Sequence, residues 1–237
     1  MFKNHPSFRP PENGNQKCWR YLDFTKFIDL IDSSQLFFTR IDKLEDPYEG
    51  TYTKRAYEQK NKAGLDHPNF YKLLITKTLV NCWHMNEHES AAMWKLYLKS
   101  DEGIAIQTTY DRIVASLDLE KELNTFVGKV NYLDYEKDSF DWGNTYNAFL
   151  HKRRSFEHER ELRIIIDLSN GNPGIKTGDL KIEHGHRIGI KLTELIESVY
   201  ISPTAPKWIF KLIKSILTRY QLDFPVYQSK LIGNILI

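Results

Sequence analysis

The sequence predicts an α+β fold, with a mixed, mainly antiparallel sheet surrounded by helices in a single domain. Three observations predict it. Short runs rich in β-branched and aromatic residues alternate with segments of helical apolar spacing. The chain has no internal repeat and no interdomain linker. Its 237 residues are enough to bury one large core. We therefore expect residues 17–237 to form the domain and residues 1–16 to form a flexible or surface-draped arm.

Predicted strands alternate with helices or loops along the whole chain. The clearest element is a helix after Pro206, because apolar residues recur at three and four positions through Tyr220 and must pack on a sheet. The loop 42–50 contains Asp46-Pro47 and ends in glycine, and loops often carry function. Strands are expected at 18–22, 35–40, 78–84, 103–108, 125–132, 162–168, 188–192, 198–202 and 225–231, and helices at 24–31, 54–77 (broken near Gly64 and Pro68) and 89–98.

Charge restricts the classes of partner. Lys and Arg number 33 against 31 Asp and Glu, so the net charge of +2 predicts no general attraction to nucleic acid or to an anionic membrane. A nucleic-acid role would need a local basic patch. The best candidate is the run His151-Lys152-Arg153-Arg154, but it is short and followed by acidic positions, which is more typical of a solvated helix end.

The cysteines and the amino terminus indicate the compartment. Cys18 and Cys82, the two cysteines of the chain, lie in apolar stretches and predict buried free thiols in a reducing cytoplasm. Residues 1–16 contain neither the apolar run of a signal peptide nor a membrane span. We therefore expect a cytoplasmic protein that does not bind membranes.

The segment 83–94 places two tryptophans and a histidine around a strand-to-helix junction. Two interpretations stay open. In one, the tryptophans line a site for a flat ligand. In the other, the segment is structural, and a capping box and core packing account for Asn86, Glu89, Met93, Trp94 and Tyr97.

A metal site is a third interpretation of this region. Cys82, His84 and His88 form a Cys-x-His-x3-His run, to which His184 and His186 would add ligands. The run matches no standard zinc spacing, so we expect no metal.

A row of acidic residues leads into the apolar run 164–166. If the strand begins early, Glu157, Glu159, Glu161 and Arg163 share one face, because alternate residues of a strand point to the same side. Three carboxylates repel one another, so the row requires nearby cations or a raised carboxyl pKa. A charged, solvent-exposed edge strand is the alternative, but the apolar run favours a central strand. The candidate cations are Arg163, Arg20, Lys152 and Arg153.

Arg20 lies between Trp19 and Tyr21 in the first predicted strand, where it is half-buried on either face. A buried arginine needs an anion, which is either one of these carboxylates in a structural ion pair or a ligand phosphate held bidentately. We expect Arg20, the segment 83–94 and the segment 157–163 to form one polar centre.

Several motifs occur in a recognisable order along nearly the whole chain from Cys18. They are Trp19-Arg20-Tyr21, Leu36-Phe37-Phe38-Thr39-Arg40, Asp46-Pro47-Tyr48-Glu49-Gly50, Cys82-Trp83 with Glu89-Ser90 and Met93-Trp94, Val130-x-Tyr132, Glu159-x-Glu161-x-Arg163 and the strand-helix-strand of 198–231. In this pattern the chain resembles the bacterial proteins of domain-of-unknown-function family 2971, a resemblance that implies no activity.

A second resemblance is to the ADP-ribosyltransferase superfamily, in which an early strand carries an Arg or His and a late strand carries the catalytic Glu. It implies an ADP-ribosyltransferase-like fold, NAD as substrate, and Arg20 as the residue that holds the dinucleotide. Trp83 or Trp94 would stack on the nicotinamide or the adenine. Glu161 would stabilise the oxocarbenium-like state in which the nicotinamide bond breaks, and Glu159 would orient the acceptor.

Two features bear on that resemblance. Phe38-Thr39-Arg40 stands where the arginine-specific members carry Ser-Thr-Ser, and Glu157-x-Glu159 fits the Glu-x-Glu pattern as well as Glu159-x-Glu161 does. The predicted catalytic residues are Glu161 and Glu159, and the predicted substrate-binding residues are Arg20, Tyr21, Thr39, Arg40, Trp83, Glu89, Trp94 and Arg163.

Three functions stay open on the sequence. The first is an NAD-dependent ADP-ribosyltransferase or NAD glycohydrolase with a nucleotide or protein acceptor, in a bacterial defence or toxin-type system. The second is a nucleotide- or protein-binding module without chemistry, in which Arg20 and the glutamates form a salt-bridge network. The third is a metal-dependent nuclease or phosphoesterase with Asp46, Glu49, Glu89 and Glu161 as ligands.

Overall fold

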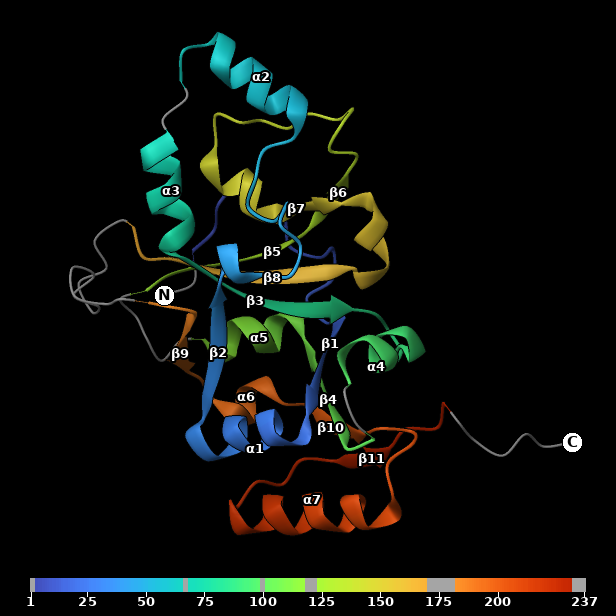
Figure 1. Ribbon diagram of the computed structural model, residues 1–237. Helices are drawn as coiled ribbons and strands as arrows, with labels where there is room; N and C mark the ends of the chain where they lie inside the picture. Colours follow the sequence, from blue (N-terminus) through green and yellow to red (C-terminus); the bar gives the residue numbers. More distant parts are fainter. Residues whose placement is uncertain (1–2, 66–67, 99–100, 118–122, 170–181, 232–237) are drawn as a thin grey trace, which may run out of the picture. The chain divides into compact units, whose positions relative to one another are not determined.

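Eleven strands and the helices between them make up the computed structural model, which describes residues 3–65, 68–98, 101–117, 123–169 and 182–231 (Figure 1). The pairs β1–β3, β1–β4, β2–β3, β4–β10 and β5–β8 are antiparallel, and β10–β11 and β6–β7 are parallel, so the predicted α+β class with a mixed, mainly antiparallel sheet is confirmed. The chain divides into two compact units. Unit 1 contains residues 1–11, 37–82 and 120–188, and unit 2 contains residues 12–36, 83–119 and 189–237.

The sheet of unit 1 is built around β8 (Glu161–Asp167), which pairs with β5 (Asn124–Lys129) and with β3 (Thr78–Met85), whose last three residues belong to unit 2. β2 (Gln35–Arg40) pairs with β3 and with β9 (Gly185–Gly189). A short parallel pair, β6 (Asn131–Leu133) and β7 (His151–Arg153), lies apart from that sheet. The helical elements are η1 (Ile41–Lys43), α2 (Lys54–Lys62), α3 (Pro68–Thr76), η2 (Thr145–Leu150) and η3 (Arg154–Glu159).

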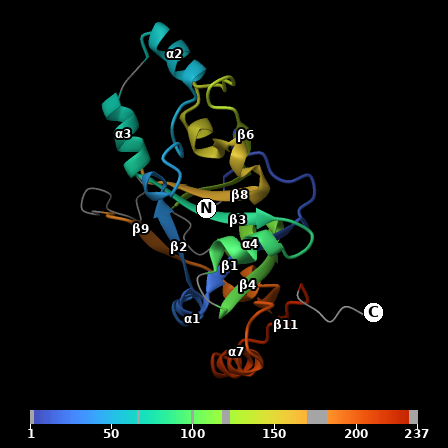
Figure 2. The same cartoon turned by 45° about the vertical axis from the view of Figure 1, so that its right-hand side comes forward.

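Unit 2 is a sheet in which β1 (Lys17–Asp23) pairs with β4 (Gly103–Thr109), β4 with β10 (Ser198–Ile201), and β10 with β11 (Val226–Gln228). Figures 1 and 2 both show α7 (Lys207–Arg219) running beside β11. Ile209, Ile213 and Leu217 of α7 are buried, which confirms the apolar face predicted for this helix. The other helices are α1 (Phe24–Ser33), α4 (Ala91–Tyr97), α5 (Tyr110–Ser116) and α6 (Leu192–Leu195).

β8 is a central strand, as the apolar run after its acidic start predicts. It is hydrogen-bonded on both sides, and all seven of its residues are buried. The predicted strand at 188–192 differs, because β9 ends at Gly189 and helix α6 begins at Leu192. In the described parts of the chain, no helix is both long and apolar enough to cross a membrane.

The amino-terminal residues around Phe8 and Arg9 contact β5 of unit 1. Phe8 is 5% exposed and stacks on Phe126 with ring centroids 4.8 Å apart. The backbone of Lys129 donates a hydrogen bond to the carbonyl of Arg9. Gly128 permits this approach, since a Cβ at that position would lie 2.7 Å from the Cα of Phe8. An aromatic side chain and a glycine on β5 therefore fix a segment whose polar composition suggests mobility.

Candidate functional site

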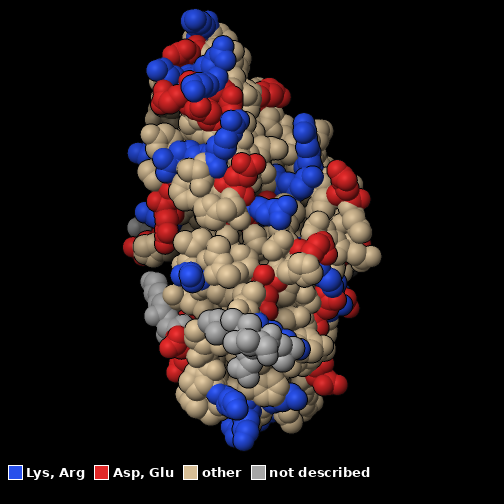
Figure 3. All heavy atoms as spheres, turned by 90° about the vertical axis from the view of Figure 1, so that its right-hand side faces the viewer, with Lys and Arg blue, Asp and Glu red and all other residues tan. Residues whose placement is uncertain are grey.

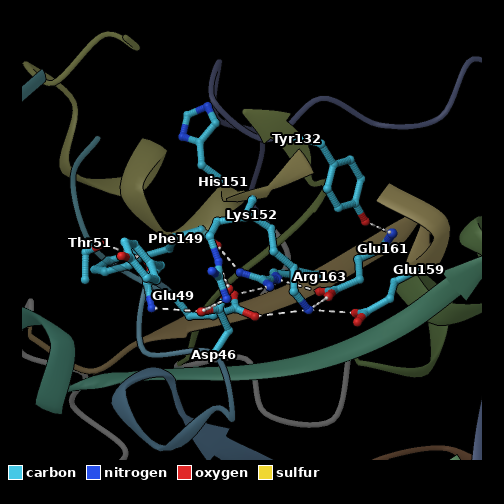
Figure 4. A network of polar contacts seen from close by, with 12 residues as sticks. Asp46, Glu49, Thr51, Tyr132, Phe149, His151, Lys152, Glu159, Glu161 and Arg163 are labelled. Atoms are coloured by element: carbon cyan, nitrogen blue, oxygen red, sulfur yellow. Dashed lines mark hydrogen bonds and ion pairs between the residues drawn. The ribbon is translucent and has the colours of Figure 1, made fainter. Parts of the chain in front are cut away.

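Five ionisable side chains of unit 1 meet in a buried network (Figure 4). Their exposed fractions lie between 0% for Arg163 and 8% for Glu49 and Glu159. They come from three separate segments of the chain, namely the loop after η1, strand β7, and the junction of η3 with β8.

The loop after η1 delivers Glu49. The Asp46 side chain accepts from the backbone N–H of Tyr48, and the Asp46 carbonyl accepts from that of Glu49, which folds the loop into a turn. Gly50 ends the turn at a φ of 71°, a conformation that glycine adopts without steric cost. The predicted functional loop therefore contributes a buried carboxylate.

Strand β7 delivers Lys152, whose ammonium group contacts three carboxylates. Its Nζ lies 2.6 Å from Glu159 Oε2, 2.7 Å from Glu161 Oε1 and 3.1 Å from Glu49 Oε1. An ammonium has three protons, so each carboxylate can accept one. The ring of Phe156 covers the same Nζ, with its centroid at 4.7 Å.

Arg163 closes the network from β8. Its Nε donates to Glu161 Oε2 at 2.7 Å, its Nη1 donates to the carbonyl of Phe149 at 2.9 Å, and its Nη2 donates to Glu49 Oε2. Glu161 and Arg163 are alternate residues of one strand, so they project from the same face as the sequence predicts. Lys152 and Arg163 are two of the four predicted cations.

Glu159 reaches the network by a different backbone route. The strand begins at Glu161, whereas Glu157 and Glu159 lie in η3. Arg160 connects the two elements at a φ of 43°, in the left-handed region that residues with a Cβ rarely occupy. Glu159 is buried by this turn, and Glu157 is exposed. The predicted row of four on one face is therefore wrong for Glu157, because the strand starts later than that pattern requires.

The charges of the network do not balance. Lys152, Glu161, Arg163 and Glu49 form a closed ring of two cations and two anions, in which each carboxylate contacts both cations. Glu159 is a third carboxyl attached to this neutral ring through Lys152. Fully ionised, these five groups would comprise three anions and two cations, and an excess of anions is unfavourable in a medium of low dielectric constant.

The pKa values of the two glutamates diverge accordingly. Burial, the hydrogen bond with Glu161 and the charge of Glu161 raise the pKa of Glu159 to about 7. Burial also raises the pKa of Glu161, but the charges of Arg163 and Lys152 outweigh it and hold that pKa well below its usual value. At neutral pH, Glu161 is therefore an anion, while Glu159 exchanges a proton.

Tyr132 and Arg153 border the network. Tyr132 lies opposite Lys152 in the β6–β7 pair, and its hydroxyl accepts from the backbone N–H of Glu161 at 2.8 Å. Burial and the charge of Glu161 raise the pKa of Tyr132, so its hydroxyl keeps a proton to donate. Arg153 binds Asp46 through two hydrogen bonds, of 3.0 and 2.9 Å.

Five predicted site residues lie in unit 2, where they form two separate groups. In the first group, the Tyr21 hydroxyl accepts from the backbone N–H of Ser90 at 2.7 Å, its ring packs edge-on against Trp94, and the Trp94 indole donates to Glu89 at 2.9 Å. In the second group, the half-buried Arg20 lies with its guanidinium 5.9 Å from the ring of Trp83, which is 1% exposed. Arg20 and Tyr21 are adjacent residues of β1, so their side chains point to opposite faces of the sheet. The single polar centre that would join these residues to the glutamates stays a prediction.

The structural interpretation of the segment 83–94 is correct in part. Met93 and Trp94 are buried, but Tyr97, the last residue of α4, is 51% exposed. The predicted capping box is wrong. Ser90 caps α4 by accepting from the backbone N–H of Met93, and Glu89 bonds to Trp94 instead.

Two other predicted site residues, Thr39 and Arg40, lie on β2 in unit 1. Thr39 pairs with Val80 in the β2–β3 ladder. The Arg40 guanidinium donates two hydrogen bonds to Asp42, of 2.8 and 2.6 Å, and a third to the carbonyl of Ile182. All three nitrogens of this guanidinium therefore bind groups of the chain itself.

A metal centre finds no support in the described ranges of the chain, where no group of three His, Cys, Asp or Glu side chains is arranged to hold an ion. Three of the carboxylates named for a nuclease, those of Asp46, Glu49 and Glu161, are bound by arginine or lysine instead. Both cysteines are free thiols, with Cys18 buried and Cys82 half-buried.

Comparison with known proteins gives low similarity. No protein-family model and no curated protein sequence matches the chain. Among solved structures, the chain is similar to three complexes of Thermus sp. 2.9 DarT. With carba-NAD+ the identity is 8%, the coverage 92% of this chain and 96% of that chain, and the TM-score 0.41. With ADP-ribosylated ssDNA the identity is 10%, the coverage 94% of this chain and 97% of that chain, and the TM-score 0.41. With NAD+ the identity is 8%, the coverage 94% of this chain and 98% of that chain, and the TM-score 0.42. These values are too low for a conclusion about activity, which therefore rests on the chain's own residues.

Proposed function

We propose that the chain is an NAD+-cleaving enzyme that transfers ADP-ribose to an acceptor or to water. The observation that supports it is the pair of buried carboxyls in one network, where Glu161 contacts both Lys152 and Arg163 while Glu159 contacts Lys152. The two cations hold the pKa of Glu161 low, whereas burial and Glu161 raise the pKa of Glu159 to about 7. Neighbouring carboxyls with pKa values pushed apart supply the anion and the acid–base group that glycosyl transfer requires.

Each residue has one role in the proposed reaction. The bond from the ribose C1′ to the nicotinamide nitrogen breaks, and its electron pair stays with nicotinamide, which leaves neutral. The Glu161 carboxylate stabilises the positive charge that develops on the ribose. Its Oε2 binds Arg163 and keeps a lone pair for a ribose hydroxyl. The acceptor oxygen or nitrogen attacks C1′ and gives its proton to Glu159, whose pKa near 7 suits a general base at neutral pH.

The test is release of nicotinamide from NAD+ by the wild type, Glu161→Gln, Glu159→Gln and Glu157→Gln. The exposed Glu157 is the matched control, since its replacement removes the same charge outside the network. Protein and ssDNA serve as acceptors. The ssDNA is included because a structure of DarT contains ADP-ribosylated ssDNA. We expect Glu161→Gln to lower the rate by about 100-fold or more, and Glu157→Gln to leave it unchanged. Absence of both nicotinamide release and labelled acceptor in the wild type would overturn the proposal.

A non-catalytic network is the second candidate. The observation that favours it is that both oxygens of Glu161, which is 4% exposed, already bind cations. Under this alternative, Glu161→Gln lowers the free energy of unfolding, and neither the wild type nor the variant turns over NAD+.

A further inference from the structure

The basic run that the sequence offers as its best nucleic-acid patch is neutralised in the fold. Lys152 is buried among three carboxylates. Arg153 pairs with Asp46 at 2.9 Å, and Arg154 pairs with Asp138 at 3.2 Å. These cations are therefore committed to carboxylates of the chain itself.

Helix α7 carries cations of a different kind. Lys207, Lys211 and Lys214 are all exposed, and the thirteen residues of the helix include no Asp or Glu. Residues at i, i+4 and i+7 share one stripe, so the three ammonium groups form a row with rises of about 6 and 4.5 Å along the axis. In the part of the chain that the structure describes, none of the three forms an ion pair. Figure 3 shows blue spheres gathered at its lower end, where α7 lies in Figure 1.

Aromatic rings flank this row. Trp208 is 54% exposed, and the ring of Phe210 lies beside Lys214 with its centroid 5.2 Å from the ammonium. An exposed ring next to a row of cations is the combination by which proteins hold single-stranded nucleic acid, because a base stacks on the ring while its phosphates pair with the cations.

The opposite side of α7 argues against a lipid surface. A helix that binds a bilayer inserts its apolar face below the headgroups. The apolar face of α7 is already buried in unit 2 through Ile209, Ile213 and Leu217. The side left for a partner is cationic and polar, with Trp208 as its exposed ring, which fits a solvated polyanion.

We propose that the face of α7 formed by Lys207, Trp208, Lys211 and Lys214 binds single-stranded nucleic acid. The three lysines pair with phosphates, and Trp208 stacks on a base. This binding requires neither NAD+ nor the glutamate network, so it stands or fails apart from the proposed enzymatic activity.

The test measures binding of a labelled oligothymidylate of about 16 nucleotides to the full chain without NAD+. The key variant is Lys207→Gln/Lys211→Gln/Lys214→Gln. Its matched control is Lys26→Gln/Lys95→Gln/Lys191→Gln, which removes the same charge from exposed lysines elsewhere in unit 2. Melting temperatures verify that both variants remain folded.

Three phosphate contacts make the slope of log affinity against log salt concentration more negative by about 2. Loss of these contacts should therefore weaken binding by the α7 variant on the order of 100-fold at 0.1 M salt. Trp208→Ala should weaken binding about tenfold, and the control variant should retain most of the affinity. The proposal is overturned if the wild type does not bind, if the control loses as much as the α7 variant, or if α7-dependent binding appears with phosphatidylserine vesicles and not with the oligonucleotide.

Discussion

Replacing Glu159 with glutamine should stabilise the protein at pH 8 and change little at pH 5. Burial and the neighbouring Glu161 raise the pKa of Glu159 from 4.5 to about 7. A carboxyl whose folded-state pKa is raised binds its proton more tightly in the folded state than in the unfolded state. The free energy of unfolding therefore falls as pH rises from 4.5 to 7, and the loss is complete above the folded pKa. Glutamine mimics the protonated form and removes that loss.

The size of the effect follows from the shift. Each unit of pKa corresponds to about 1.4 kcal/mol, so a shift from 4.5 to about 7 corresponds to about 3 kcal/mol if fully expressed. Water that reaches the carboxyl reduces this, and we expect Glu159→Gln to raise the free energy of unfolding by about 1–2 kcal/mol at pH 8.

Urea unfolding of the wild type, Glu159→Gln and the exposed control Glu157→Gln at pH 5 and pH 8 measures this gain. The control should change the free energy of unfolding by less than about 0.5 kcal/mol at both pH values. A Glu159→Gln protein that is destabilised at pH 8, or whose gain is the same at both pH values, would refute the charge imbalance.

Three further comparisons test the ion network, the turn before β8 and the packing of the amino-terminal segment. Lys152→Met should lower the free energy of unfolding by about 3–5 kcal/mol, because it leaves buried carboxylates without that cation. Adding Glu49→Gln to this variant should recover part of the loss. If the effects of the two substitutions on the free energy of unfolding, measured in urea, simply add, the closed ring is contradicted. Arg160→Val should cost about 1–2 kcal/mol more than Arg160→Gly at the left-handed turn, and equal stability of the two variants would exclude strain there. Phe8→Ala should cost about 3–5 kcal/mol, as measured by chemical unfolding, and a neutral effect would show that the amino-terminal segment does not belong to the core.

Local pattern in the sequence predicts most of the fold. A continuous apolar run identifies β8, which is buried on both faces, and helical spacing identifies α7, which places one apolar face on a core. The helix cap differs from prediction although its signal is local, because Ser90 accepts from the backbone N–H of Met93, whereas the predicted capping box begins at Asn86. The packing of Phe8 has no local signal, because it depends on stacking with Phe126, which is distant in the sequence.

The candidate site is predicted only in part. The repulsion among carboxylates correctly indicates Lys152 and Arg163 as partners, since a buried acidic row requires cations. The role of Glu49 is missed, because it lies 114 residues from Arg163 and no local pattern links the two. The burial of Glu159 beside Glu161 depends on the left-handed conformation of Arg160, which alternation along a strand does not encode.

The most direct measurement is a pH titration of the glutamate side-chain carboxyl carbons by NMR, in the wild type and in Glu159→Gln. The closed ring of Lys152, Glu161, Arg163 and Glu49 leaves Glu159 as the surplus carboxyl. We therefore expect one glutamate resonance with a midpoint near the pKa of about 7, absent from the variant. A wild-type spectrum in which every glutamate titrates below pH 5 would contradict the account.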